Sequence, residues 1–153
     1  MSREEAVPGT DLQELVARGM KAADSGRTAA ALECFERVVR LQSTPANWSY
    51  LAFCLARERR QFEHATRLCE EAVRREPHSS VLYLNLGKVH LLAGRKDDAI
   101  RTFRQGLLYE RNALIESELR RLGLRKPPVL SFLAREHPVN KYLGIVLKKL
   151  KIR

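Results

Sequence analysis

Aromatic residues are scarce in this chain, and their scarcity argues against a large β-sheet. Of the 153 residues, 7% are Phe, Trp or Tyr, whereas Ala, Leu, Arg and Glu are abundant. Aromatic and β-branched side chains favour strands, while the abundant residues favour helices. With 44% hydrophobic residues, the chain can fill one core. The composition therefore predicts a single helical domain.

Long apolar runs are also missing. No run approaches the roughly 20 residues that a membrane-spanning helix needs. The first residues, MSREEAVPGTD, are charged and lack the apolar stretch of a signal peptide. We therefore expect a cytoplasmic protein.

Cysteine occurs only three times, as Cys34, Cys54 and Cys69, and no two of these residues have CxxC spacing. An odd number of scattered cysteines does not suggest a disulfide framework or a metal site. We expect reduced, buried thiols in a reducing compartment, rather than a redox centre.

Recognisable patterns for catalysis are absent from the sequence. None of His64, His78, His90 and His137 stands beside a cysteine, carboxylate or second histidine at a spacing typical of zinc. Asp97 and Asp98 lie at the start of an expected helix, where acids stabilise the first turn. No glycine-rich phosphate loop or serine nucleophile motif is present. We predict no catalytic residues, no metal and no cofactor, so the chain is not expected to be an enzyme.

The positive charge is concentrated near the C-terminus. The net charge is +10, but residues 114–153 hold ten Lys or Arg against three Glu, which gives +7 and leaves +3 for the first 113 residues. A basic segment can dock on nucleic acid or anionic lipid, or can simply be solvated. The sequence leaves these alternatives open.

A spacing of 34 residues recurs along the chain. It relates Ala31, Ala65 and Ala99, and also the residues four positions later, Phe35, Cys69 and Phe103. A fixed period of this length indicates a solenoid of stacked helix pairs. The expected first helices cover residues 11–24, 46–58 and 80–93, and the second helices cover 28–42, 62–75 and 96–109.

The residues at these positions resemble the tetratricopeptide repeat (TPR) family, whose pattern is W-x2-L-G-x2-Y, then A-x3-F, then P. The third unit matches best, with Tyr83, Leu86, Gly87, His90, Ala99 and Phe103. The second unit has Trp48, Leu51, Ala52, Leu55, Ala65, Cys69 and Pro77, with one extra residue in the turn between its helices. The first unit keeps Leu15, Gly19, Ala22, Ala31 and Phe35.

The resemblance implies an all-α, right-handed α-solenoid of three TPR helix pairs. It covers about residues 12–111, divided into 12–45, 46–79 and 80–111, after an N-terminal lead at 1–11. In this fold, a glycine within a helix allows two helices to cross closely. We therefore interpret Gly87 as a packing residue.

Two further segments follow the repeats. Residues 112–126 are expected to form a capping helix, because Ile115, Leu119 and Leu122 recur on one helical face. Residues 127–153 are a basic tail with an amphipathic helix, whose apolar residues are Val139, Tyr142, Leu143, Val146, Leu147 and Leu150. Its basic residues are Lys141, Lys148, Lys149 and Lys151. This tail could cover the groove, cap the solenoid or bind a partner.

In the TPR family, the first helices of successive repeats line a concave groove that binds peptides or protein segments. The resemblance implies that the groove here consists of Val16, Met20, Phe53, Arg57, Leu84, Asn85, Lys88 and Leu91. Asn85 and Lys88 are similar to part of a carboxylate-binding set in some TPR proteins, but apolar residues stand at the other positions of that set.

We therefore predict a non-catalytic TPR adaptor that binds a peptide or segment of another protein in its groove. The alternative is a module whose basic tail docks on nucleic acid or membrane lipid. The partner and the oligomeric state are not specified by the sequence.

Overall fold

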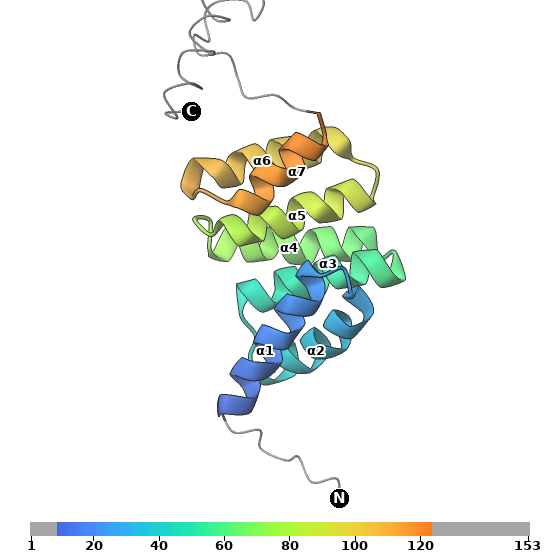
Figure 1. Ribbon diagram of the computed structural model, residues 1–153, viewed down its shortest axis with the longest axis vertical. Coiled ribbons are helices and arrows are strands. Elements are labelled where there is room, and N and C mark those ends of the chain that lie inside the picture. Colours follow the sequence, from blue (N-terminus) through green and yellow to red (C-terminus); the bar gives the residue numbers. More distant parts are fainter. Residues whose placement is uncertain (1–8, 124–153) are drawn as a thin grey trace, which may run out of the picture. The chain divides into compact units, whose positions relative to one another are not determined.

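The computed structural model describes residues 9–123, which form seven α-helices and no β-strand (Figure 1). The helices are α1 (Gly9–Asp24), α2 (Thr28–Leu41), α3 (Pro45–Arg59), α4 (Phe62–Arg75), α5 (Ser80–Leu92), α6 (Lys96–Tyr109) and α7 (Ala113–Arg121). The predicted all-α class is confirmed, and α1 to α6 begin and end within two residues of their expected positions. The capping helix α7 ends at Arg121, five residues before its expected end. The basic tail, residues 127–153, lies outside the described residues.

The chain divides into two compact units, Met1–Glu118 and Leu119–Arg153. The first unit contains α1 to α6 and most of α7. Of the second unit, the structure describes residues 119–123, which include the end of α7.

Within the first unit, consecutive helices pack as antiparallel pairs. These pairs are α1 with α2, α3 with α4, and α5 with α6 (Figure 1). Successive pairs join because α3 packs on α2 and on α5, while α4 packs on α5. Each added pair therefore buries an apolar face of the pair before it, as in an α-solenoid.

Gly87 lies where α5 crosses α6, and the structure explains why a glycine stands there. A Cβ atom at this position would overlap the ring of Phe103, which is fully buried. The same arrangement recurs in the first pair, where a Cβ on Gly19 would lie 2.9 Å from Cε2 of Phe35. In the second pair, small residues remain at the crossing, since Ala52 and Ala65 are both fully buried.

The turns within the helix pairs use left-handed backbone conformations. Gly26 and Gly94 have φ angles of 77° and 75°, which glycine adopts without the steric cost of a side chain. In the second pair, Arg60 adopts φ 55° instead. The extra residue predicted for this turn lies in α3, which continues to Arg59 and leaves Arg60 and Gln61 as the connection. The expectation of a longer turn was therefore wrong: two residues connect α3 to α4, whereas three residues connect α1 to α2 and α5 to α6.

Side-chain hydrogen bonds connect helix ends that are about one repeat apart in sequence. At the start of α5, the hydroxyl of Ser80 donates to Oε2 of Glu110 over 2.7 Å, and the Ser80 backbone N–H donates to the same oxygen over 3.3 Å. Asn112 Nδ2 donates to Ser80 Oγ over 3.0 Å. At the start of α2, Thr28 likewise donates to Glu58 near the end of α3. The carboxylate of Glu110 thereby accepts the backbone N–H of Ser80, which has no acceptor within its own helix.

The three cysteines are free and buried, as predicted. Burial, and then the carboxylate of Glu58, raises the pKa of Cys54 to about 12. Burial also raises the pKa of Cys69 well above its usual range. Both thiols are therefore protonated at neutral pH and packed as small apolar groups.

The crossing of α5 and α6 gives a first prediction. Gly87→Ala should lower the free energy of unfolding by about 1–3 kcal/mol, because the added methyl group overpacks the contact with Phe103. Chemical denaturation measures this change. In a Phe103→Leu background, the same substitution should cost less, because the ring that it would overlap is gone. Equal costs in the two backgrounds would contradict this explanation of Gly87.

The buried thiols give a second prediction. A thiol reagent should modify Cys34, Cys54 and Cys69 slowly in the native chain at neutral pH, because all three side chains are shielded from solvent. For Cys54 and Cys69, the raised pKa also makes the reactive thiolate scarce. Labelling should become fast after unfolding in denaturant. Rapid labelling of all three thiols under native conditions would contradict their burial.

Candidate protein-binding surface

The residues predicted to line a groove come from α1, α3 and α5, the first helices of the three pairs. The structure leaves six of them accessible in different degrees, which we call the first-helix surface. Met20 and Arg57 are exposed, and Val16, Phe53, Lys88 and Leu91 are half-buried. The other two predicted residues, Leu84 and Asn85, are only 2% and 1% exposed. They have little surface to offer a partner.

Phe53 and Lys88 lie in direct contact and connect α3 to α5 in the first-helix surface. The ammonium nitrogen of Lys88 lies 5.0 Å from the centroid of the Phe53 ring. A cation in this position is attracted by the negative face of the ring. Val16 of α1 and Phe53 of α3 also pack against the same buried cluster, which includes Leu15 and Tyr50. The same buried cluster therefore supports the first-helix surface at Val16 and at Phe53.

Asn85 acts inside the structure. Its Nδ2 donates to Oγ of Ser49 over 3.0 Å, and the Ser49 hydroxyl donates to the carbonyl oxygen of Ala46 over 2.8 Å. Both Asn85 and Ser49 are almost completely buried. The pair forms a polar link between α3 and α5 beneath the first-helix surface.

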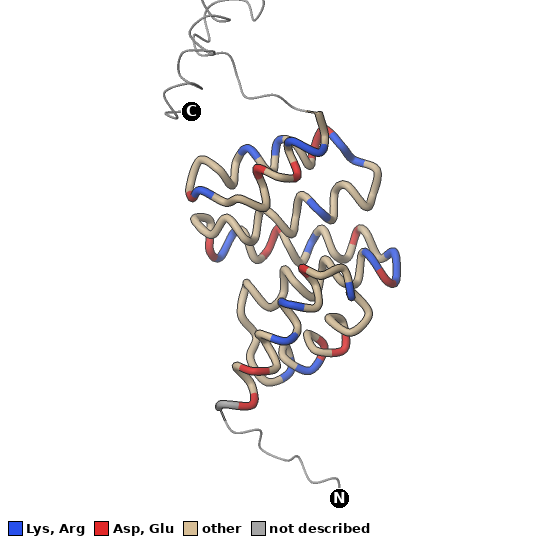
Figure 2. The backbone as a smooth tube through the Cα atoms, in the orientation of Figure 1, with Lys and Arg blue, Asp and Glu red and all other residues tan. Residues whose placement is uncertain are grey.

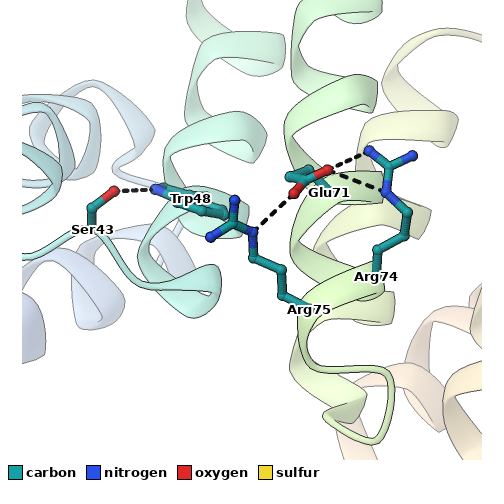
Figure 3. A network of polar contacts seen from close by, with 5 residues as sticks. All are labelled: Ser43, Trp48, Glu71, Arg74 and Arg75. Carbon is teal, nitrogen blue, oxygen red and sulfur yellow. Dashed lines mark hydrogen bonds and ion pairs between the residues drawn. The ribbon is translucent and has the colours of Figure 1, made fainter.

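A cluster of polar side chains that was not predicted from the sequence surrounds Trp48 (Figure 3). The indole Nε1 donates to Oγ of Ser43 over 2.8 Å, and the guanidinium of Arg75 lies 4.6 Å from the Trp48 ring centroid. Glu71 accepts hydrogen bonds from Arg75, over 2.9 Å to Nε, and from Arg74. The arginine bonds hold the pKa of Glu71 below its usual value, with Arg74 the larger cause. The signal in the sequence was the helical spacing of Glu71 and the two arginines.

Several apolar side chains are exposed away from the first-helix surface. Leu108 of α6 is 77% exposed, Leu114 of α7 is 50% exposed, and Leu41 at the end of α2 is 50% exposed. Tyr109 is 41% exposed and stacks on Tyr83, with 5.6 Å between ring centroids. Charged residues of both signs are distributed over the described helices (Figure 2).

Among residues 9–123, no group of three or more His, Cys, Asp or Glu side chains is arranged to hold a metal ion. In the same range, no helix has the length and hydropathy needed to span a membrane. The four tail lysines named above lie beyond the described residues.

Known proteins with related sequences and folds give an independent view of this arrangement. Residues 56–122 match the tetratricopeptide repeat family, while no curated protein matches the chain. The first TPR domain of Spaghetti (RPAP3), solved with the HSP90 peptide SRMEEVD, is 20% identical, with a TM-score of 0.57. That similarity covers 76% of this chain and 96% of the domain.

Two further solved structures have the same TM-score of 0.57. The first TPR domain of human RPAP3 is 20% identical, with 73% of this chain and 89% of that domain covered. PcrH from Pseudomonas aeruginosa is 17% identical, with 80% of this chain and 94% of that protein covered. At these identities, the likeness establishes a shared fold.

The sequence match, the small residues at the helix crossings and the stacked helix pairs all indicate the same fold. Residues 56–122 therefore match the tetratricopeptide repeat family, and the stacked helix pairs have the TPR fold.

Proposed function

We propose that the chain is a non-catalytic adaptor that binds a linear segment of another protein on its first-helix surface. The observation that carries this proposal is the contact between Lys88 and Phe53, which brings a cation and an aromatic ring together between α3 and α5. Met20 on α1 and Arg57 on α3 are also exposed, so the first-helix surface offers a further apolar and a further basic side chain. Such a surface suits a segment that carries apolar side chains and an acidic group.

The fold supports this proposal. Stacked helix pairs present long surfaces that bind extended segments of partners. The similar TPR domain of Spaghetti (RPAP3) was solved with the peptide SRMEEVD, which has two glutamates, an aspartate and apolar residues. Family members generally act as interaction modules without catalytic activity. By analogy, we propose the same class of partner here, a peptide or protein segment.

The free, buried thiols suit a reducing compartment, so we retain the cytoplasm in the proposal. An alternative function is docking of the basic C-terminal segment on nucleic acid or anionic lipid. The net charge of +7 over residues 114–153 favours it. The two functions respond differently to salt, because phosphate contacts release counterions.

A peptide selected from a random display library against the full chain tests the adaptor function. Met20→Glu should weaken binding of that peptide by about tenfold or more, because it places a carboxylate within an apolar contact and opposes an acidic segment. Calorimetric titration measures the affinity. Since Met20 is 36% exposed, the substitution should leave the fold intact, which circular dichroism verifies.

Leu108→Glu is the matched control, since it introduces the same carboxylate at an exposed apolar residue of α6. Its affinity for the peptide should equal that of the unmodified chain. Binding should also persist at about 0.5 M salt, whereas phosphate-driven binding would fall by orders of magnitude. A peptide whose affinity depends on Leu108 but not on Met20 would overturn the proposed surface.

A further inference from the structure

His90 is a titratable side chain inside the fold that the proposed function does not use. It lies on α5 and is 7% exposed. Its Nδ1 atom is buried and has no hydrogen-bond partner among the described residues. A neutral imidazole tolerates this position, because an unprotonated Nδ1 carries no N–H group that needs an acceptor. A protonated ring would place both a charge and an additional donor in the interior.

The charged groups around His90 come from α4, from α6 and from the turn between α5 and α6. Arg95 in that turn donates to Oγ1 of Thr66 on α4 over 2.7 Å, and its backbone N–H donates to the His90 carbonyl oxygen over 2.9 Å. The other charged groups that act on His90 are Glu70 of α4 and the ion pair of Asp98 with Arg101 on α6.

These groups make protonation of His90 unfavourable. Burial lowers the pKa of His90 most, and Arg95 lowers it further, with a smaller contribution from Arg101. Asp98 and Glu70 act in the opposite direction but do not compensate. Asp98 is already paired with Arg101. At neutral pH, the buried ring is therefore uncharged.

We propose that His90 makes α5 an acid-sensitive joint, in which the neutral ring allows α5 to pack between α4 and α6 and the protonated ring loosens that packing. The geometry that supports this joint is the buried Nδ1 atom of His90, which has no hydrogen-bond partner among the described residues. The first pair is different, since α1 and α2 contain no histidine. Acid should therefore act on the later pairs before the first.

The direction of the effect follows from linkage. In an unfolded chain, a histidine titrates near pH 6.5. Because the folded chain lowers the pKa of His90, the unfolded chain binds the proton more readily. The stabilising effect of the neutral ring is fully present above the unfolded pKa and is lost as the pH falls toward the folded pKa. Lys88 and Leu91 lie on the same helix, so loosening would also disturb the first-helix surface; only this consequence rests on the proposed function.

Urea unfolding of the full chain between about pH 7.5 and pH 5 tests the proposal. We compare the unmodified chain with His90→Phe, which fills similar space and cannot titrate. Below about pH 6.5, the folding equilibrium constant of the unmodified chain should fall relative to that of His90→Phe, by up to about tenfold per pH unit. His64→Gln, which removes an exposed histidine on α4, should follow the unmodified chain. Identical pH dependence of the unmodified chain and His90→Phe would overturn the proposal.

Hydrogen exchange of the unmodified chain, corrected for intrinsic rates, tests whether the loosening is local. At about pH 5.5, amides of α5 and α6 should lose protection relative to those of α1 and α2. An equal loss of protection in all helices would overturn the joint. His90→Tyr serves as a second non-basic variant in both measurements if His90→Phe does not fold. The pH dependence of its stability should also be weaker than that of the unmodified chain.

Discussion

The close approach of two helices at a residue without a side chain is the constraint on which this structure depends. At Gly87, the ring of Phe103 occupies the space that a Cβ would take. Because the ring fits against bare backbone, α5 and α6 can approach closely where they cross, and α3 and α4 pack on α5. Phe35 against Gly19 repeats the arrangement at the start of the chain. The distance between the two helices of a pair therefore depends on small residues at the crossing as well as on the large aromatic residues that they contact.

This packing also determines which predicted binding residues remain accessible. As α3 and α5 approach each other, Asn85 is drawn into a hydrogen bond with Ser49, and Leu84 is buried beside it. Phe53 and Lys88 stay at the surface and contact each other across the two helices. The proposed binding surface therefore includes the side chains of Phe53 and Lys88 but not the buried amide of Asn85.

The sequence predicted the helices well because their signals are local or strictly periodic. Small residues every 34 positions identify the crossings. At the start of α3, the Thr44 side chain accepts the Asn47 N–H over 3.3 Å. The length of α3 was not predictable in the same way, because Arg60 takes a left-handed conformation that the other turns assign to glycine. The Ser49–Asn85 bond was missed because it joins residues 36 positions apart. Only the stacking of two repeats brings these side chains together.

Two side-chain hydrogen bonds cross the boundaries of the sequence repeats, Thr28 with Glu58 and Asn112 with Ser80. The start of α5 receives its acceptor from the residue that follows α6, and Asn112 joins the same hydroxyl from the approach to α7. Thr28 at the start of α2 and Glu58 near the end of α3 connect the first pair to the second. A segment cut out at the repeat boundaries would therefore separate Thr28 from Glu58 and Ser80 from Asn112, although it would keep the bond between Ser80 and Glu110. A duplicated repeat would make such bonds only where its new neighbour supplied the partner side chains.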